Sequence, residues 1–359
     1  MKKVKLGELV SIQTGKLDAN AAVVGGKYPF FTTAKEISWI NDYVYDDEVV
    51  LVAGNGDLNV KYYKGKFNAY QRTYILSNNS NVRMKYLYYF LDKYIKVLRH
   101  QSIGGVIKYI KLNNLSNAQV PMMSIPEQEK IIKNLEKIDY LISKKSQQYT
   151  ELSKLVKSRF NEMFGDPVLN DMGWEIETLD KVGTIGRGVS KYRPRNASEL
   201  FGGIYPFIQT GDVANSGNYI VDYHSTYSEF GLKQSKLWDK GTLCITIAAN
   251  IAKTSILAFD SCFPDSIVGF IPGERTNNMF IHYWFSYFQK MLESQAPESA
   301  QKNINLKILS ELKVILPPLA LQNEFADFVA QVDKSQLAIQ KSLEELETLK
   351  KSLMQEYFG

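Results

Sequence analysis

Residue types that could carry catalysis are present in this sequence of 359 residues, but they are not grouped for it. The histidines His100, His224 and His282 are scattered, without a serine elbow or a cysteine partner to activate. The acids at 46–48 are consecutive, so they do not share one strand face around a metal ion. The stretch GNGD at 54–57 is too short for a dinucleotide fingerprint and is predicted to be a turn. We therefore predict no enzymatic activity, no metal site and no cofactor.

The remaining composition is that of an ordinary globular chain. Its length exceeds one typical core, so two or three domains are expected. Cys244 and Cys262 lack a CxxC spacing and a nearby histidine pair, and we expect buried, reduced thiols. There is no run of about 18 apolar residues and no signal-type apolar core at the start. These features predict a soluble, cytoplasmic protein without a membrane segment.

The formal net charge of +5 is unevenly distributed along the chain. Basic minus acidic residues give +8 for 1–121, +2 for 122–165, −2 for 166–317 and −3 for 318–359. A basic excess permits phosphate binding without establishing it, because many surfaces carry solvated lysines. The run KYRPR at 191–195 is the most prominent patch, because the segment around it is otherwise acidic.

One stretch of the chain occurs twice. Residues 112–165 and 306–359 align at a constant offset of 194 without a gap. Such self-similarity decides the architecture. The residues that recur as identical are Leu112, Leu115, Ser116, Val120, Gln128, Asp139, Glu151, Leu152, Leu155, Lys157, Ser158, Glu162, Phe164 and Gly165. The chain is therefore predicted to be two copies of one unit, each a globular segment followed by a long helix.

The two globular segments share landmarks that are less well preserved. GGIYPFIQT in the second segment echoes GGKYPFFTT in the first. Turn residues between short runs such as VVLVA and RTYIL predict strands of a mixed, β-rich domain. The stretch at 84–99 has apolar residues at helical spacing and predicts a packed helix. The start, KLGELVSIQTGK, is expected to be a short amphipathic turn or helix ending at Gly15.

The last part of each copy has the pattern of a coiled-coil helix, with a four-three apolar spacing sustained over about five heptads. Prolines precede it in both copies, and Pro126 suits a first helical turn. The polar residues Lys145, Arg159, Gln336 and Lys350 interrupt the seam and are expected to fix its register. The apolar seam positions are Ile131, Leu135, Ile138, Ile142, Leu152, Val156, Phe325, Val329, Val332, Ile339, Leu343, Leu346 and Leu353.

The two helices are expected to pack antiparallel, because the globular segments that precede them would otherwise collide at one end. A helix over 126–164 is about 57 Å long at 1.5 Å per residue. The predicted fold class is α+β, with two pseudo-symmetric, mixed α/β-rich lobes separated by two long antiparallel coiled-coil helices. The predicted domains are 1–121, 122–165, 166–317 and 318–359, which alternate lobe and helix.

The helix entries PMMSIPEQEKI and LPPLALQNEFADFV and the ends KLVKSRFNEMFG and ETLKKSLMQEYFG give the chain its resemblance to a family. Together with the two-copy layout, they resemble the specificity (S) subunits of Type I DNA restriction-modification systems. In the second copy Leu321 precedes Gln322, where Glu127 precedes Gln128 in the first.

The resemblance implies two target-recognition domains that each read one half of a split sequence in double-stranded DNA. It also implies that the repeat helices dock two modification (methyltransferase) subunits, which methylate adenine. It leaves open whether restriction (translocase and nuclease) subunits bind as well.

In such a reader, Lys and Arg contact phosphates, while loop Asn, Gln, Arg, Ser and Thr read base edges. The DNA-binding candidates of the first lobe are Lys16, Thr33, Lys35, Asn55, Asn59, Lys61, Lys64, Gln71 and Arg72. Those of the second lobe are Arg187, Lys191, Arg193, Arg195, Gln209, Thr210, Asn250, Lys253, Gln301 and Asn303. For each of them, a solvated surface position is an equally good interpretation.

Two other classes of function compete with this hypothesis. An adenine methyltransferase would, by family resemblance, carry an Asn-Pro-Pro-aromatic motif, and Pro317-Pro318 lacks both flanking residues. A two-lobed adaptor for a protein or glycan is the stronger alternative, because the second lobe is net acidic. Steep salt dependence of DNA binding would favour the DNA reader, since bound phosphates release counterions.

Overall fold

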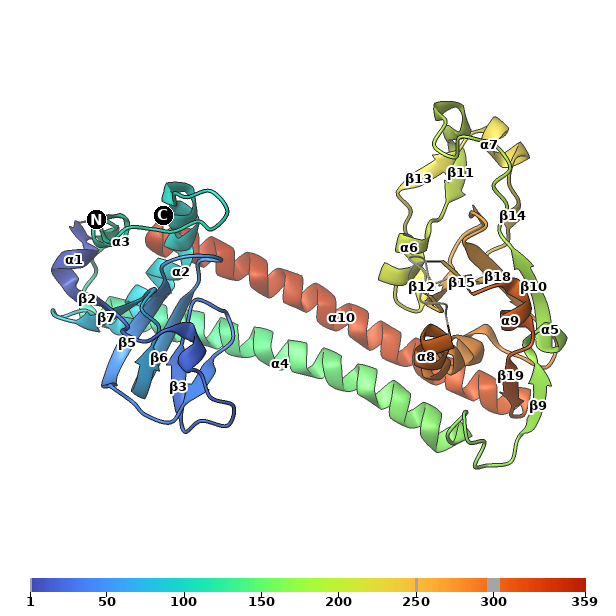
Figure 1. Ribbon diagram of the computed structural model, residues 1–359, viewed down its shortest axis with the longest axis horizontal. Coiled ribbons are helices and arrows are strands. Elements are labelled where there is room, and N and C mark those ends of the chain that lie inside the picture. Colours follow the sequence, from blue (N-terminus) through green and yellow to red (C-terminus); the bar gives the residue numbers. More distant parts are fainter. Residues whose placement is uncertain (1, 249–250, 296–303) are drawn as a thin grey trace. The chain divides into compact units, whose positions relative to one another are not determined.

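The computed structural model describes residues 2–248, 251–295 and 304–359, with the side chains of 290–295 left out (Figure 1). The chain forms two compact units, one of residues 1–147 with 339–359 and the other of residues 148–338. Each unit contains one lobe together with a part of both long helices, α4 (Ile125–Phe164) and α10 (Leu319–Phe358). The mixed α/β fold with two long helices confirms the predicted fold class.

The first unit is built on a six-stranded sheet in the order β2-β7-β5-β6-β3-β4, in which only the β3–β6 pairing is parallel. Its strands are β1 (Lys3–Lys5), β2 (Val10–Thr14), β3 (Tyr28–Phe31), β4 (Ser38–Ile40), β5 (Tyr45–Ala53), β6 (Val60–Ala69), β7 (Thr73–Asn78) and β8 (Gln119–Pro121). Its shorter helices are α1 (Leu6–Leu9), η1 (Ala19–Ala21), α2 (Met84–Gln101) and α3 (Leu112–Ser116). Strand β1 pairs with β8 in a separate two-stranded sheet.

Alternation along β5 explains how this sheet is covered. Val50 and Val52 point into a core shared with α2, while Val49 and Leu51 belong to a second cluster on the opposite face. The expectation of a turn or helix up to Gly15 was wrong beyond Leu9. Residues 10–14 form β2, because their alternating side chains let the segment pair with β7 along its whole length.

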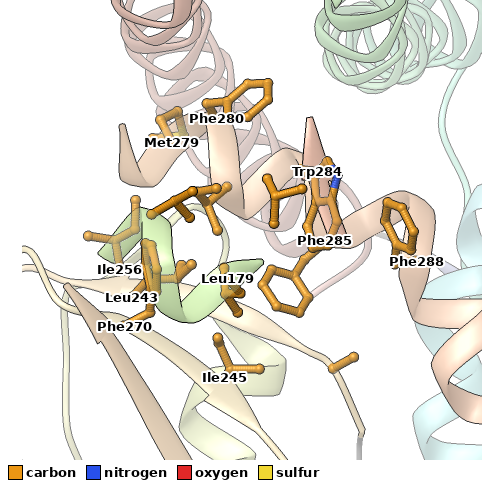
Figure 2. Close-up of a cluster of buried hydrophobic side chains, with 14 of the residues drawn as sticks. Leu179, Leu243, Ile245, Ile256, Phe270, Met279, Phe280, Trp284, Phe285 and Phe288 are labelled. Carbon is orange, nitrogen blue, oxygen red and sulfur yellow. The ribbon is translucent and has the colours of Figure 1, made fainter. Parts of the chain in front are cut away.

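The second unit contains a five-stranded sheet, β10-β18-β15-β16-β12, a four-stranded sheet, β13-β11-β17-β14, and the pair β19-β9. Its strands are β9 (Glu175–Thr178), β10 (Gly183–Arg187), β11 (Phe201–Phe207), β12 (Tyr219–Ile220), β13 (Ser225–Tyr227), β14 (Leu237–Trp238), β15 (Leu243–Thr246), β16 (Thr254–Leu257), β17 (Ser261–Cys262), β18 (Ile267–Pro272) and β19 (Lys313–Leu316). Its shorter helices are α5 (Leu179–Val182), η2 (Ser198–Leu200), α6 (Thr210–Asn215), α7 (Glu229–Lys233), α8 (Asn278–Gln295) and α9 (Leu306–Ser310). Figure 2 shows Phe280, Trp284 and Phe285 of α8 in the same buried cluster as Leu243 and Phe270 of the sheet.

The repeat extends further than the sequence comparison indicated. The offset of 194 also relates the bounds of β7 to those of β18 and the start of α2 to the start of α8, and it holds for α3 with α9 and α4 with α10. Both copies therefore share one register from the last strand of each lobe's main sheet to the end of the long helix. The two lobes differ in length mainly before that strand.

The ends of the long helices lie in the hydrophobic cores of the lobes. In the first unit, Phe358 of α10 contacts Tyr86 and Phe90 of α2, with ring centroids 5.1 and 6.1 Å apart. In the second unit, Phe164 of α4 lies 4.9 Å from Phe280 of α8. Because Phe164 and Phe358 are related by the same offset, each lobe is completed by the far end of the other copy's helix.

A buried glutamine joins each lobe to the start of its own helix. Gln128 accepts a hydrogen bond from the Arg83 backbone N–H at 3.0 Å and donates one to the Met123 carbonyl at 2.9 Å. Gln322 makes the equivalent bonds with Asn277 and Pro317, at 2.9 and 2.8 Å. Both side chains are fully buried, so the repeated glutamine has a structural role.

The residue before the buried glutamine differs between the copies, and each of the two residues has its own local role. Glu127 caps α4 by accepting hydrogen bonds from the Ser124 backbone N–H and hydroxyl, at 2.9 and 2.6 Å. These bonds lower the pKa of the Glu127 carboxyl. Leu321 instead packs against the core of the second unit. The second copy thus replaces a capping interaction with an apolar contact.

The two long helices run antiparallel within each unit. Asp139 forms an ion pair with Lys350 at 2.7 Å in the first unit. In the second unit, Gln336 donates to Ser153 at 2.9 Å and Arg159 pairs with Glu324 at 3.0 Å. Three of the polar residues at the seam therefore make cross-helix contacts.

The apolar seam positions fall into two groups. Seven positions are buried, namely Ile131, Leu135, Ile138, Val156, Phe325, Val329 and Val332. The others are half-buried, namely Ile142, Leu152, Ile339, Leu343, Leu346 and Leu353. Within the described part of the chain, no helix is long and apolar enough to cross a membrane.

Replacing Phe164 by alanine tests whether the helix end is part of the lobe's core. The buried ring would leave a cavity, so we expect Phe164→Ala to lower the free energy of unfolding by about 3–5 kcal/mol. Leu155→Ala on the same helix is the control and should cost less than about 1 kcal/mol, because Leu155 is largely exposed. Equal effects of the two substitutions in urea unfolding would contradict this packing.

Candidate nucleic-acid interface

The first unit has a polar cleft where four connections meet. The cleft, here called the first cleft, has a volume of about 270 Å³. It is lined by Thr14, Gly54, Gln71, Arg72, Tyr74, Tyr109 and Ile110. Gln71 and Arg72 lie on the turn between β6 and β7, and Tyr109 lies on the segment that follows α2. The cleft therefore presents an amide, a guanidinium and two phenol rings on one surface.

Two glycines let these connections approach one another. The Gly54 N–H donates to the Arg72 carbonyl at 2.8 Å, and the Ile110 N–H donates to the Gly54 carbonyl at 2.9 Å. A Cβ atom on Gly54 would lie 2.6 Å from the Arg72 oxygen, and one on Gly15 would lie 2.1 Å from the Ala69 oxygen. Any side chain at either position would separate the strands that form the cleft. The stretch GNGD thus belongs to the tight connection between β5 and β6, as predicted for a turn, and its Gly54 lines the cleft.

The remaining candidates of the first lobe are placed around this cleft or bound within the fold. Lys16 and Asn55 adjoin the cleft through the pairings of Leu17 with Tyr70 and of Asn55 with Tyr109.

Asn59 and Lys61 hold the loop after β3, because they donate to the backbone carbonyls of Thr33 and Ala34 at 2.8 and 2.6 Å. Burial lowers the pKa of Lys61. Two other candidates form ion pairs on the surface, Lys35 with Asp57 at 3.5 Å and Lys64 with Glu48 at 3.3 Å.

The second unit has a larger cleft with an aromatic floor. This second cleft has a volume of about 350 Å³. Its lining consists of Ser190, Arg195, Asn196, Phe201, Phe207, Gln209, Thr210, Tyr227, Pro264 and Ser266. The rings of Phe207 and Tyr227 are stacked with centroids 4.1 Å apart. Burial raises the pKa of Tyr227.

The basic run at 191–195 is less available than its sequence suggests. Arg195 lines the second cleft and pairs with Asp265 at 2.7 Å, while Arg187 donates to the Asp265 backbone carbonyl. Arg193 turns back onto its own loop and donates to the carbonyls of Ser190 and Tyr192 at 2.7 and 2.9 Å. Lys191 is exposed.

The other second-lobe candidates divide into three groups. Gln209 and Thr210 line the second cleft, and Gln209 also begins α6 in a capping box with Asp212. Lys253 donates to Gln289 of α8 at 3.2 Å and does not line this cleft. The remaining candidates lie outside the described residues, namely Asn250, Gln301 and Asn303.

The two clefts occupy equivalent places in the repeat. The offset of 194 relates Arg72 of the first cleft to Ser266 of the second, and Gln71 to Asp265, the ion-pair partner of the lining residue Arg195. Both pairs stand on the connection that leads into the equivalent strands β7 and β18. One scaffold therefore carries two clefts with different side chains.

Sequence reasoning missed the aromatic residues of both clefts. Tyr74 and Tyr109 in the first cleft and Phe207 and Tyr227 in the second read as ordinary strand or loop residues. Tyr74 donates a hydrogen bond to the Ile110 carbonyl at 3.2 Å, a contact that depends on pairing across 36 positions of the chain. No local signal in the sequence indicates such a pairing.

The histidines and cysteines that were weighed as catalytic candidates contact residues of the fold or lie buried in it. His282 is half-buried on α8 with its Nδ1 2.9 Å from the Thr254 hydroxyl, and exposed His224 lies 2.8 Å from Asp212. Cys244 and Cys262 are both buried and unlinked, and burial raises the pKa of each thiol. Across the described ranges, no cluster of His, Cys, Asp or Glu has the arrangement of a metal site.

A comparison with known families identifies the family of this chain. A family profile described as the type I restriction modification DNA specificity domain matches residues 1–154 and 172–349. The chain belongs to this family. Specificity subunits have a non-catalytic role, which confirms the prediction that the chain is not an enzyme. The match also favours the DNA reader over the adaptor hypothesis.

Individual relatives match this chain over nearly its whole length. The type I restriction enzyme EcoDI specificity subunit of Escherichia coli is 28% identical over 400 residues, which cover 99% of this chain and 87% of the relative. The MjaVIII specificity subunit of Methanocaldococcus jannaschii is 22% identical, with coverages of 98% and 90%. The crystal structure of the S subunit from M. genitalium aligns with a TM-score of 0.66 at 17% identity, and covers 100% of this chain and 96% of that one.

The half-buried His282 of this specificity subunit predicts a pH dependence of stability. Burial lowers the pKa of His282 to about 4, whereas an unfolded histidine titrates near pH 6.5. The unfolded chain therefore takes up a proton first, and stability falls as the pH drops from about 6.5 towards 4. We therefore expect the contribution of His282 to the free energy of unfolding to be about 2 kcal/mol lower at pH 5 than at pH 7.

His282→Asn separates this contribution from those of other groups. Its unfolding free energy, measured with urea at both pH values, should fall by about 2 kcal/mol less than that of the unsubstituted chain. Parallel pH profiles of the two proteins would show that His282 is not held neutral.

Proposed function

We propose that the two lobes read the two halves of a bipartite target in double-stranded DNA, one half with each cleft. The observation that carries the proposal is the equivalence of the clefts, which share a place in the repeat but differ in their side chains. A shared scaffold with different reading residues suits two half sites of different sequence.

The side chains of each cleft suit particular contacts with bases. Arg72 and Arg195 match the acceptor pair on the major-groove edge of guanine, whereas Gln71 and Gln209 match adenine. Phosphate contacts would come from the exposed cations nearby, Lys16 in the first lobe and Lys191 in the second. The ion pair of Arg195 with Asp265 would hold the guanidinium ready for such a contact.

The chain itself would not catalyse a reaction, and its partner subunits would carry the active sites. We propose that modification subunits, two per chain, dock on α4 and α10 and methylate an adenine in each half site. The continuous helices would set the length of the gap between the halves. A structure described as showing the complex assembly of the type I R-M system contains a chain that aligns with this one at 16% identity and a TM-score of 0.59, and covers 99% of this chain and 97% of its own. We propose that restriction subunits join the same complex and that it acts in the cytoplasm.

Two arginines of one loop provide a matched test of the second cleft. We expect Arg195→Ala to weaken binding of the complex with modification subunits to its target by about tenfold to 100-fold, because one base contact contributes about 1–3 kcal/mol. The affinity would be measured by fluorescence anisotropy at fixed salt, on targets mutated in one half at a time.

The control is Arg193→Ala, which removes an equal charge that is already bound to its own loop. It should change the affinity less than threefold. The loss caused by Arg195→Ala should be confined to bases of one half site. Equal effects of the two substitutions, or a loss spread over both halves, would contradict the assignment of the cleft.

A further inference from the structure

The loop that follows α2 presents two neighbouring apolar side chains to solvent. Val106 is fully exposed and Ile107 is 61% exposed. These two residues are here called the apolar tip. Among the described residues, the hydrophobic clusters of the first unit include neither of them. The apolar tip therefore does not stabilise the lobe, and adjacent apolar side chains left this exposed are typical of a surface that binds something.

Backbone hydrogen bonds hold this loop in one conformation. Ile103 and Tyr109 each donate an N–H to the carbonyl of the other, at 3.0 and 2.9 Å, and so close the loop at its base. Gly104 has a φ of +114°, and a Cβ atom there would lie 2.5 Å from the Ile107 carbonyl oxygen. The turn that carries the apolar tip therefore requires glycine, and the tip is presented in a fixed shape.

The base of the loop is part of the first cleft. Tyr109 lines the cleft together with Gln71 and Arg72. The Gly56 N–H donates to the Lys108 carbonyl at 2.8 Å and ties the loop to the turn between β5 and β6. The apolar tip is therefore attached to the rim of the surface that carries the polar reading residues of the first lobe.

The chain around the tip is basic. Residues 93–126 contain five lysines and arginines and no aspartate or glutamate. Lys108 and Lys111 of this segment are both exposed. A surface with this charge favours a polyanionic partner, and double-stranded DNA is the polyanion of the proposed function.

We infer that the apolar tip reads a thymine of the first half site by contact with its 5-methyl group. The inference rests on the proposed function and adds an apolar contact to the polar ones of the first cleft. On the base edges of the major groove, the thymine methyl is the apolar group that DNA offers. Val106 and Ile107 have no polar side-chain atom, so they would leave the donors and acceptors of another base without a partner.

Removing that methyl group from the DNA tests the inference. Each thymine of a synthetic target duplex would be replaced in turn by deoxyuridine, which keeps every hydrogen-bonding group of the base. Binding of the complex with modification subunits would be measured by fluorescence anisotropy at fixed salt. We expect the affinity to fall about three- to fivefold at one or more positions, all in one half site, as for one methyl group removed from an apolar contact.

The protein side of the contact is tested by the double variant Val106→Ser with Ile107→Ser, which should bind the thymine and uracil duplexes equally well. Val24→Ser is the matched control, because Val24 is also fully exposed. Its neighbour Val23 donates an N–H to Trp39 of β4 at 2.7 Å, at the opposite edge of the sheet from β2. The control should keep the preference for thymine. Because the substituted side chains are exposed, the thermal unfolding midpoints should stay unchanged.

Three results would overturn the inference. They are a selectively bound target that is insensitive to every uracil, an unchanged preference for thymine in the double variant, and an equal loss of this preference in Val24→Ser. Loss of modification subunits from the double variant in native mass spectrometry would also overturn it, and would assign the apolar tip to a protein contact. The proposed function fails separately, if the unsubstituted complex shows no preference for a bipartite target.

Discussion

The structure depends on the burial of each helix end in the core of a lobe. Phe164 and Phe358 each complete a hydrophobic cluster in which many of the other members lie far away in the sequence. The cost of exposing such a ring is several kcal/mol, a large part of the stability of a typical domain. Neither lobe is therefore a self-contained segment of the chain, because each contains parts of both helices.

This constraint separates the parts of the lobe that are fixed from those that can vary. The elements from β7 and β18 onwards keep one register in both copies, and they include the buried glutamines Gln128 and Gln322 that lock helix to lobe. The connections before those strands line part of each cleft, and the residues there differ between the two copies. A reading surface can change there without loss of the fold.

The repeat, the long helices, their antiparallel pairing and the fold class followed from the sequence, because a constant offset and a heptad pattern persist over many residues. The clefts were only partly predictable. Gln71, Arg72, Arg195, Gln209 and Thr210 were chosen by residue type and do line them.

Other candidates have internal partners that only the folded chain reveals. Asn59 and Lys61 bind a neighbouring loop, and Arg193 binds its own. The aromatic floor of the second cleft arises from the pairing of β11 with β13, in which Phe207 and Tyr227 come together from distant positions. Residue type thus indicates the chemistry of a surface, while long-range pairing decides which side chains are available for it.

The most direct test of a two-lobed DNA reader is single-molecule sequencing of adenine methylation in cells. Cells that express this chain together with its modification subunit would be compared with cells that express the subunit alone. The account predicts a new motif of two unlike halves separated by a fixed gap, present only with the chain. No new methylation, with both proteins folded and bound to each other, would contradict the account, as would a motif without a gap.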